Sequence, residues 1–379
     1  MIIMLPFIDL KAQQDRIRLQ IEAAIKKVLD HGKYIMGPEV LELSEKLAKF
    51  VNAKHCITCS SGTDALLMGL MAYSVGPGDA ILTTPFTFIA TTEVINLVGA
   101  TPIFVDINPE TYTVDVDRIE EAIERINAEG KLKPRGIIPV DLFGSPAEYD
   151  AIMRIAEKHH VFVLQDAAQA FGAEYHGRKC PSLGHIGATS FFPAKPLGCY
   201  GDGGAVFTND DQVAEIISSI RIHGQGSDKY DNVRVGLNAR MDTLQAAILL
   251  EKLKLYPEEI QLRQQVAQAY FKYLKHKTLN TKLQRVPEGA LSVYAQFCVE
   301  IDRRDMIQAK LREEGIPTVI YYPKPLHLMR AYAHLGYKVG DFPVSERVSQ
   351  RILALPMHPY MKRQAVKFIV DTLYKCVGN

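Results

Sequence analysis

Between residues 56 and 208, short apolar runs alternate with stretches of helical periodicity, and this alternation restricts the chain to few folds. The runs hold few polar residues, which is typical of strands that are covered on both faces. Strands that alternate with helices predict a mostly parallel, doubly wound α/β sheet. The expected strands are Cys56–Ser60, Ala80–Thr84, Pro102–Asp106, Gly136–Asp141, Val161–Gln165, Thr189–Phe192 and Gly204–Thr208, and the expected helices are Thr63–Tyr73, Ile89–Leu97, Asp117–Ala128 and Ala147–His159.

One connection in this region departs from the pattern. The segment Pro193–Gly203 joins the last two expected strands and is rich in Gly and Pro. A crossover between parallel strands needs about a dozen residues or more, usually a helix. We therefore expect these two strands to be antiparallel, so that the sheet is mixed and contains one antiparallel strand.

Beyond Met241 the pattern changes to long helices and then to a mixture of short elements. Pro257 lies within the helical part and is predicted to kink or break it. We expect a large domain over residues 1–255, including the N-terminal segment, and a smaller α+β domain over residues 256–379. The expected helices are Met241–Leu253, Glu258–Lys275, Asp305–Glu314 and Ser345–Leu353, and the expected strands are Val293–Ile301 and Pro317–Tyr322.

The charge balance and the apolar runs exclude several classes of protein. Lys and Arg number 44 against 43 Asp and Glu, and the formal net charge is +1. A dedicated nucleic-acid-binding protein normally has a basic excess, so we expect no nucleic-acid partner. The longest apolar stretches are far shorter than the ~20 residues that span a bilayer, and the N-terminus does not resemble a signal peptide. We expect a cytoplasmic protein with no membrane contact.

The cysteines do not predict a metal site. Among the six, only Cys56 and Cys59 form a close pair. A zinc site needs a second pair of Cys or His ligands at suitable spacing, and the sequence offers none. We interpret the pair as two small residues of a buried strand in a reduced protein, and we expect no metal.

A motif of small residues follows the first expected strand. Ser60, Ser61, Gly62 and Thr63 open the next helix. Small residues at such a junction allow backbone N–H groups to face a phosphate, and the positive end of the helix dipole favours an anion. Ser and Thr are also common N-caps, so this motif alone leaves both interpretations open.

An acid and a lysine follow two further strands. Asp166 ends a hydrophobic run, and open α/β sheets bind ligands at the carboxyl ends of their strands. Lys195 stands between Pro193 and Pro196, beside two phenylalanines, in the short antiparallel connection. Partial desolvation lowers the pKa of a lysine and makes its neutral amine available to bond a carbonyl carbon. Taken singly, Asp166 would cap a turn and Lys195 would be a surface residue.

These three features fall at one edge of one predicted sheet. Pyridoxal phosphate requires a phosphate site, an acid against its ring nitrogen and a lysine for its aldehyde. Neither a Walker A motif nor a G-x-G-x-x-G motif occurs, which weakens nucleotide hydrolysis and dinucleotide binding as rivals. The combination therefore predicts a pyridoxal-phosphate site.

Several longer motifs carry a resemblance that covers essentially the whole chain. They are PFIDLKAQ near the start, YIMGPEV at 34–40, SSGTDAL at 60–66, PFTFIAT at 85–91, GATPIFVDI at 99–107, QDAAQAFGA at 165–173, SFFPAKPLG at 190–198, GDGGAVFTND at 201–210, HGQ at 223–225 and GLNARMDTLQAA at 236–247. In these motifs the chain resembles the DegT/DnrJ/EryC1/StrS family of pyridoxal-phosphate-dependent nucleotide-sugar aminotransferases. The resemblance implies the aspartate-aminotransferase fold, which is fold type I of these enzymes.

The resemblance also implies a role for individual residues. Lys195 corresponds to the lysine that bonds the cofactor aldehyde, Asp166 to the partner of the ring nitrogen, and Gln169 to the group that bonds the phenolic oxygen. The other implied cofactor contacts are Ser61, Gly62, Thr63 and Ser190 at the phosphate, Phe88 stacked on the ring, and Asn238 as a phosphate ligand from a neighbouring subunit. The last contact implies a homodimer whose active sites are shared across the interface.

Within the family, the likeness is closest to enzymes that aminate C3 of a UDP-linked 3-keto-N-acetylglucosaminuronic acid, with L-glutamate as the expected donor. The product would be a diamino uronic acid sugar for surface polysaccharide such as lipopolysaccharide O-antigen. Such a substrate carries a carboxylate, and Arg240, two residues beyond Asn238, is the candidate cation for it. The alternative is a surface arginine, or one paired with Asp242.

The segment YYPKPLH offers further candidates for substrate binding. Tyr321 stands where many relatives have His, and His327 completes the segment. Both residues fit a contact with the nucleotide-sugar, and both fit packing within the small domain.

Two rival functions stay open. One is amination of another keto sugar, such as a dTDP-linked 3- or 4-keto-6-deoxyhexose. The other is a non-catalytic pyridoxal-phosphate sensor, against which the complete set of Lys195, Asp166 and Gln169 argues. Relatives that dehydrate sugars carry His at the lysine position, so Lys195 also argues against that chemistry.

Overall fold

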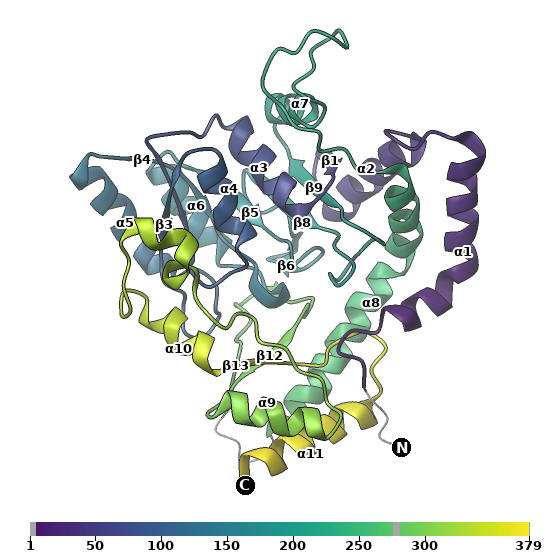
Figure 1. Ribbon diagram of the computed structural model, residues 1–379, viewed down its shortest axis with the longest axis vertical. Helices are drawn as coiled ribbons and strands as arrows, with labels where there is room; N and C mark the ends of the chain where they lie inside the picture. The colour runs from purple at the N-terminus through teal and green to yellow at the C-terminus, as the bar shows by residue number, and fades with distance from the viewer. Residues whose placement is uncertain (1–4, 276–280, 379) are drawn as a thin grey trace.

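The computed structural model describes residues 5–275 and 281–378. Its centre is a seven-stranded sheet in the order β1-β9-β8-β5-β4-β2-β3 (Figure 1). Strand β9 is antiparallel to both of its neighbours, whereas the other neighbouring pairs are parallel. The predicted mixed sheet with one antiparallel strand is confirmed. The strands are β1 (His55–Cys59), β2 (Asp79–Thr83), β3 (Thr101–Phe104), β4 (Lys133–Ile138), β5 (Phe162–Asp166), β8 (Ile186–Ser190) and β9 (Gly204–Thr208).

Helices cover both faces of the sheet, and the strand side chains on both faces are apolar. Leu164 and Val206 belong to the core beneath α3, α4 and α7. Leu82 faces the opposite core with α5 and α6, and Phe207 packs there with α2 and α8. Burial on both sides explains why the strands read as continuous apolar runs. The helices are α2 (Pro38–Val51), α3 (Gly62–Ala72), α4 (Ala90–Leu97), α5 (Val116–Glu129), α6 (Tyr149–Lys158), α7 (Asp211–Ile220) and α8 (Thr243–Lys275).

The connection between β8 and β9 has the predicted geometry. Ser190 pairs with Gly204 in an antiparallel register, so the chain reverses between these two residues. Strand β8 begins at Ile186 rather than at the predicted Thr189, because the run of small residues at its start is buried and pairs with β5. Lys195 therefore lies in the loop between the two strands, as expected.

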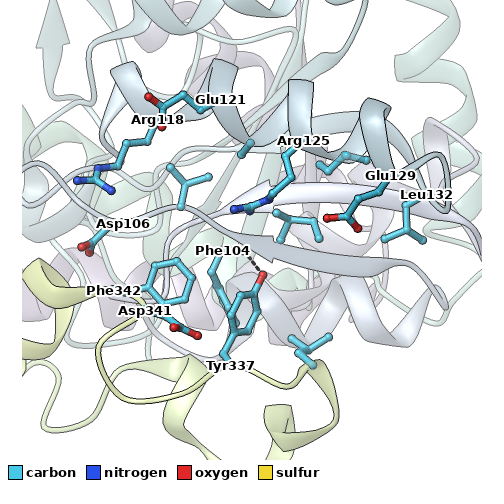
Figure 2. A pocket seen from close by; sticks show the side chains of 15 residues that line it. Phe104, Asp106, Arg118, Glu121, Arg125, Glu129, Leu132, Tyr337, Asp341 and Phe342 are labelled. Atoms are coloured by element: carbon cyan, nitrogen blue, oxygen red, sulfur yellow. Dashed lines mark hydrogen bonds between the residues drawn. The ribbon is translucent and has the colours of Figure 1, made fainter.

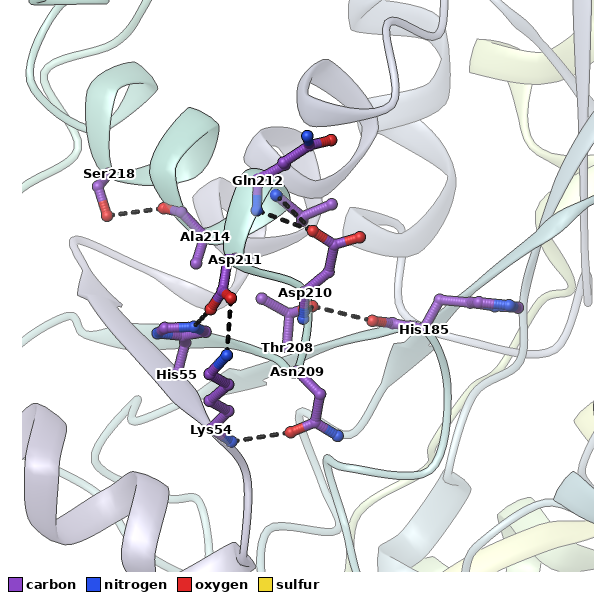
Figure 3. Close-up of polar contacts among 11 residues, drawn as sticks. Lys54, His55, His185, Thr208, Asn209, Asp210, Asp211, Gln212, Ala214 and Ser218 are labelled. Atoms are coloured by element: carbon purple, nitrogen blue, oxygen red, sulfur yellow. Dashed lines mark hydrogen bonds and ion pairs between the residues drawn. The ribbon is translucent and has the colours of Figure 1, made fainter.

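Ion pairs on the surface connect the start of β1 to the start of α7 (Figure 3). Asp210 caps α7, because its Oδ1 accepts from the backbone N–H of Gln212 at 2.8 Å. Asp211 accepts from Lys54 at 2.7 Å and contacts the His55 ring at 2.6 Å. Exposed pairs of this kind contribute little stability, and the register of β1 is set by its backbone pairing with β9.

Helix α8 runs through Pro257 without a break, so the break that was predicted as one outcome there is wrong. Proline removes a backbone hydrogen bond and destabilises a helix interior by about 3 kcal/mol. Packing on both sides of Pro257 outweighs that penalty. Tyr256 is fully buried in the core of the large domain, and Tyr270 is fully buried in the core of the small domain. The predicted boundary at residue 255 falls within this shared helix.

The N-terminal segment contacts elements on both sides of α8. Helix α1 (Leu10–His31) packs along α8 (Figure 1). Before it, Leu5 packs against the core of the small domain, and Phe7 accepts a backbone hydrogen bond from Met357 at 3.1 Å. The segment therefore touches the small domain as well as the large one.

The small domain is an α+β structure, as predicted. Its sheet has the order β10-β12-β13 and is antiparallel, and α9 and α11 pack beside it (Figure 1). The predicted strand Pro317–Tyr322 is wrong, because only Val319 makes a bridge, to Ala354. The elements are β10 (Lys282–Leu283), β12 (Phe297–Glu300), β13 (Ile352–Leu355), α9 (Arg304–Glu313), α10 (Pro343–Arg351), α11 (Arg363–Gly378), and the short helices η2 (Leu326–Leu328) and η3 (Arg330–Leu335).

The remaining elements are small. Strands β11 (Ala290–Leu291), β6 (Glu174–Tyr175) and β7 (Arg178–Lys179) form a third sheet, and η1 (Leu142–Gly144) follows β4. In the described part of the chain, no helix combines the length and the apolar character needed to cross a membrane.

Candidate active site

The phosphate motif and the loop that carries Lys195 meet at one edge of the sheet. Gly62 begins α3 and lies against Ser190 at the end of β8. A Cβ atom on Gly62 would stand 2.6 Å from the Cβ of Ser190, so only glycine permits this approach. Gly204 is equally close to the backbone of Ser61. The structure brings Ser61, Gly62 and Ser190 together at this edge, and their contact with a phosphate stays a prediction.

The start of α3 has the features of an anion site. Ser61 is the N-cap, and its Oγ accepts from the N–H of Asp64 at 3.0 Å. Gly62 and Thr63 occupy the first turn, where backbone N–H groups have no partner within the helix. The helix dipole places positive potential at the same point. The N-cap interpretation of Ser61 is observed. The phosphate interpretation stays a prediction, and the two are compatible because the N-cap hydroxyl and the free N–H groups are different atoms.

Asp166 ends β5 in a buried position, with 5% of its surface exposed. Its Oδ2 accepts from the Thr91 hydroxyl at 2.8 Å, and its Oδ1 accepts from the N–H of Ala168 at 3.1 Å. Burial raises the pKa of this carboxyl group, while Thr91, Ala168 and the charge of Lys195 oppose the rise. A cation placed against Asp166 would relieve the unfavourable burial of its charge.

Lys195 lies within electrostatic range of Asp166. Burial lowers the pKa of the Lys195 amine, and the negative charge of Asp166 opposes this effect. Its backbone N–H donates to the Phe192 carbonyl at 2.8 Å, which fixes a tight turn at this position. The lysine and the acid, predicted from separate strands, are brought together.

The structure fixes the orientation of the Gln169 side-chain amide, which is 6% exposed. Its Oε1 accepts from the backbone N–H of Phe143 at 2.7 Å. A backbone N–H can only donate, so the amide oxygen must face Phe143 and the NH₂ group must face the other way. That NH₂ group donates to the Tyr322 hydroxyl at 3.0 Å, and its second hydrogen remains available for another acceptor.

Phe88 presents an exposed ring at the same place. More than half of its surface, 55%, is open to solvent, which is unusual for an aromatic residue beside a core. Its ring centroid lies 6.2 Å from that of Tyr322. The exposed face suits a planar ring stacked on it.

The segment that carries Asn238 and Arg240 runs beside the phosphate motif. The carbonyl of Ala239 accepts from the N–H of Ser60 at 3.0 Å. Asn238 is exposed, and Arg240 has a buried Nε atom without a hydrogen-bond partner. Among the residues that the structure describes, no acid pairs with Arg240, so the predicted alternative of a pair with Asp242 is not observed.

Tyr321 and His327 occupy different environments. Tyr321 is half-buried, and its ring lies 6.4 Å from that of Phe7. His327 is 2% exposed, and its Nε2 lies 3.0 Å from Oε1 of Glu346. Burial lowers the pKa of His327, which favours the neutral ring. In the single chain His327 is therefore a packing residue of the small domain, and its contact with substrate stays a prediction.

The sequence of almost the whole chain matches one family of enzymes. Residues 15–374 match the model of the DegT/DnrJ/EryC1/StrS aminotransferase family. The chain belongs to this family. The family's enzymes are pyridoxal-phosphate-dependent sugar aminotransferases, and the predicted family, fold, activity and cofactor are confirmed.

Individual relatives cover the chain almost completely. The UDP-2-acetamido-2-deoxy-3-oxo-D-glucuronate aminotransferase of Pseudomonas aeruginosa is 48% identical over 98% of this chain and 99% of its own length. A DegT/DnrJ/EryC1/StrS aminotransferase from Brucella abortus has 48% identity and a TM-score of 0.95, and the match covers 99% of this chain and 100% of the other. The DesV enzyme of S. venezuelae, solved in complex with a ketimine intermediate, has 34% identity and a TM-score of 0.94, with 99% of each chain covered.

The residues present fit the family's cofactor. The glycine contact at Gly62 leaves room for an anion at the start of α3, and the buried carboxylate of Asp166 lacks a charged hydrogen-bond partner of its own. When bound, pyridoxal phosphate takes the amino group from a donor and passes it to a keto sugar. In the described residues no three His, Cys, Asp or Glu side chains gather as a metal site would require.

Two further residues at this aminotransferase site escaped the sequence analysis. Thr91 bonds Asp166, and Tyr322 bonds Gln169. Thr91 ends the PFTFIAT motif and Tyr322 lies in YYPKPLH, so both stood in motifs that had been recognised. Only the fold shows which side chain of each motif turns toward Asp166 and Gln169.

A groove lies at some distance in the sequence from these residues. It has a volume of about 570 Å³ and runs between α5 and the loop at 337–342, with Arg118, Arg125 and Phe342 among its lining residues (Figure 2). Arg118 pairs with Asp115 at 3.2 Å. None of the predicted site residues, all of which the structure describes, lines this groove.

Proposed function

We propose that this aminotransferase moves the amino group of L-glutamate to C3 of a UDP-linked 3-keto-N-acetylglucosaminuronic acid. The proposal includes a cytoplasmic role in making a diamino uronic acid sugar for surface polysaccharide. The observation that carries it is Arg240, whose neighbour Ala239 bonds Ser60 of the phosphate motif. The Nε of Arg240 is buried without a hydrogen-bond partner, and no acid pairs with this arginine among the described residues. An unpaired cation at a sugar-binding site suits a substrate that brings its own carboxylate.

At the cofactor end, three residues hold and move charge. Lys195 would hold the cofactor through its aldehyde, and its amine, when free, would move the proton at the donor Cα as general base and acid. The lowered pKa of its amine supports this role, because the neutral amine is the form that attacks and accepts protons. Asp166 keeps the ring nitrogen protonated, and Gln169 donates from its NH₂ group to the phenolic oxygen.

The phosphate is assigned to the start of α3. Backbone N–H groups of Gly62 and Thr63, together with the hydroxyls of Ser61 and Ser190, are the proposed ligands, and Phe88 is proposed to stack on the ring. The exposed ring of Phe88 and the close approach of Gly62 to Ser190 support these assignments.

We extend the proposal to a homodimer with shared sites. Asn238 is exposed, and so are apolar side chains elsewhere, including Phe192 at 51% and Tyr230 at 84%. Large exposed apolar side chains do not stabilise a monomer, and groups of them commonly mark an interface. In the dimer, Asn238 reaches the partner's phosphate and Arg240 reads the uronate.

The relative from Pseudomonas aeruginosa supports the choice of sugar, since its name specifies a 3-oxo-glucuronate and its identity to this chain is 48%. The test is a panel of substrates with glutamate as donor, in which 2-oxoglutarate is measured. The panel holds the UDP-linked 3-keto uronate, its 6-hydroxymethyl analogue, and dTDP-linked 3- and 4-keto-6-deoxyhexoses. We expect the uronate to give the highest kcat/KM, and faster turnover of a dTDP-linked sugar would overturn the proposal.

A further inference from the structure

One buried lysine has no part in the proposed chemistry. Lys252 lies on α8 with 1% of its surface exposed, whereas lysines are almost never fully buried without a partner. Its Nζ donates to the carbonyl of Gly198 at 2.6 Å. The same Nζ lies 4.3 Å from the centroid of the Tyr200 ring. Both contacts are with the loop between β8 and β9, which carries Lys195.

The loop transmits this contact to the backbone of Lys195. A Cβ atom on Gly198 would stand 2.6 Å from the carbonyl oxygens of both Phe192 and Pro193, so the two arms of the loop are in direct contact. The carbonyl of Phe192 is the acceptor for the N–H of Lys195, at 2.8 Å. Lys252 is therefore linked to Lys195 through Gly198 and Phe192.

A second residue of α8 forms a hydrogen bond with the same loop. Gln245 lies two helical turns before Lys252, which places both on one face of the helix. Its Oε1 accepts from the N–H of Tyr200 at 2.9 Å. Cys199 closes the loop from within, because its N–H donates to the Phe191 carbonyl at 2.8 Å. The loop is thus fixed by α8 at two adjoining points.

We propose that Lys252 is a positioning residue for Lys195: its ammonium group holds the Gly198 arm of the loop, and thereby sets the place of the reactive amine. A plain packing role fits the residue less well. An apolar side chain would fill the same space without the unfavourable burial of a charge. Burial lowers the pKa of Lys252 to about 8, so the fold retains a charge that it does not favour. The inference rests on the proposed function, since it takes Lys195 as the lysine that bonds the cofactor.

The test compares Lys252→Met with two other variants. Methionine nearly matches the length of lysine and removes both the charge and the donor. Lys252→Arg keeps a cation over Tyr200 and donors toward Gly198. Lys254→Met is the matched control, because Lys254 lies on the same helix, is exposed and pairs only with Glu251 among the described residues.

The principal measurement is the glutamate half-reaction of each holoenzyme, followed by the absorbance of the bound cofactor across a range of glutamate concentrations. For Lys252→Met we expect the maximal rate to fall about 10- to 100-fold with little change in the half-saturating concentration, because the amine is misplaced while the donor site is intact. Lys252→Arg should recover part of the rate, and Lys254→Met should match wild type. An unchanged maximal rate, or an equal loss in Lys254→Met, would overturn the proposal.

Two readouts do not depend on turnover. Hydrogen exchange of the peptide that spans residues 193–203 should be faster in Lys252→Met than in wild type, while that of α3 should be unchanged. Equal exchange in that peptide would contradict the proposal. Borohydride reduction of the wild-type holoenzyme followed by peptide mapping should label Lys195. A label elsewhere would refute the proposed function itself, whereas a label on Lys195 with normal kinetics in Lys252→Met would refute only the role of Lys252.

Discussion

The two ends of the active site are built in opposite ways. At the cofactor end, Asp166 and Gln169 are buried, and each makes two hydrogen bonds within the same chain. At the proposed sugar end, the Nε of Arg240 has no hydrogen-bond partner among the described residues, and the nearby Asn238, proposed to reach a neighbouring subunit, is exposed. A rigid, satisfied set of contacts suits a permanent cofactor, whereas unsatisfied groups suit a ligand that comes and goes and a neighbouring subunit.

This contrast predicts how substitutions should divide between the two half-reactions. Changes at the cofactor end should impair both, because both use the same bound group. Changes at the sugar end should impair the second half-reaction far more than the first. Measuring the two separately is therefore more informative than measuring overall turnover.

The largest effect is expected from Lys195→Ala. The variant should lose the absorbance band of the lysine-bound cofactor and all measurable transamination, since no other lysine is predicted at this edge. The fold should persist. The Lys195 side chain is only partly buried, and the hydrogen bond that fixes the turn comes from the backbone N–H, which alanine retains. Circular dichroism checks the fold. Substantial residual activity in both half-reactions would remove Lys195 from its assigned role.

Asp166→Asn should have the next largest effect. The amide has the same shape and can accept from Thr91, so the variant should still bind the cofactor. It carries no charge to balance the protonated ring nitrogen, and we expect both half-reactions to slow roughly 100-fold or more. Cofactor content is measured by absorbance and the rates by rapid mixing. Turnover close to that of wild type would show that the ring nitrogen is served by another group.

Arg240→Ala should act at the sugar end alone. A hydrogen bond to a charged group contributes about 1.5–3 kcal/mol, which corresponds to a loss of roughly 10- to 200-fold in kcat/KM for the uronate. A guanidinium suits the task because its planar fork bonds a carboxylate bidentately. The glutamate half-reaction should change much less.

The matched comparison for Arg240 is the 6-hydroxymethyl analogue of the sugar, which lacks the carboxylate. Wild type should prefer the uronate, and Arg240→Ala should lose that preference. Equal losses for both sugars would show that Arg240 does not recognise the carboxylate. A large loss in the glutamate half-reaction would show that the arginine receives the carboxylate of glutamate instead.

The contrast between the two ends also explains which parts of the candidate site could be predicted from the sequence. The strands around Asp166 and Ser190 are continuous apolar runs, and the residue at the end of such a run must lie at the sheet edge. Their meeting with Gly62 and Lys195 could therefore be predicted. The predicted break at Pro257 was wrong, because local helix propensity does not account for the packing of α8 against two cores.

Contacts between distant segments were the part that could not be predicted. Tyr322 reaches Gln169 across 153 positions of the sequence. Nothing in the YYPKPLH motif indicates which of its two tyrosines contacts Gln169, because both lie outside the helices and strands and have no periodicity to read. The burial of His327 against Glu346 could not be predicted either, because it depends on how the small domain folds around this residue.

Tyr322 supplies the smallest predicted effect and the sharpest test of the contrast. Tyr322→Phe removes the hydroxyl that accepts from Gln169, while the bond from Phe143 still orients the amide. A neutral hydrogen bond contributes about 0.5–1.5 kcal/mol, so we expect both half-reactions to slow roughly 2- to 12-fold. The neighbouring variant Tyr321→Phe should instead affect only the sugar half-reaction, since no described residue bonds its hydroxyl and its predicted partner is substrate. If Tyr322→Phe impaired the sugar half-reaction alone, Tyr322 would belong to the sugar end, and its bond to Gln169 would be a feature of the unliganded chain that substrate displaces.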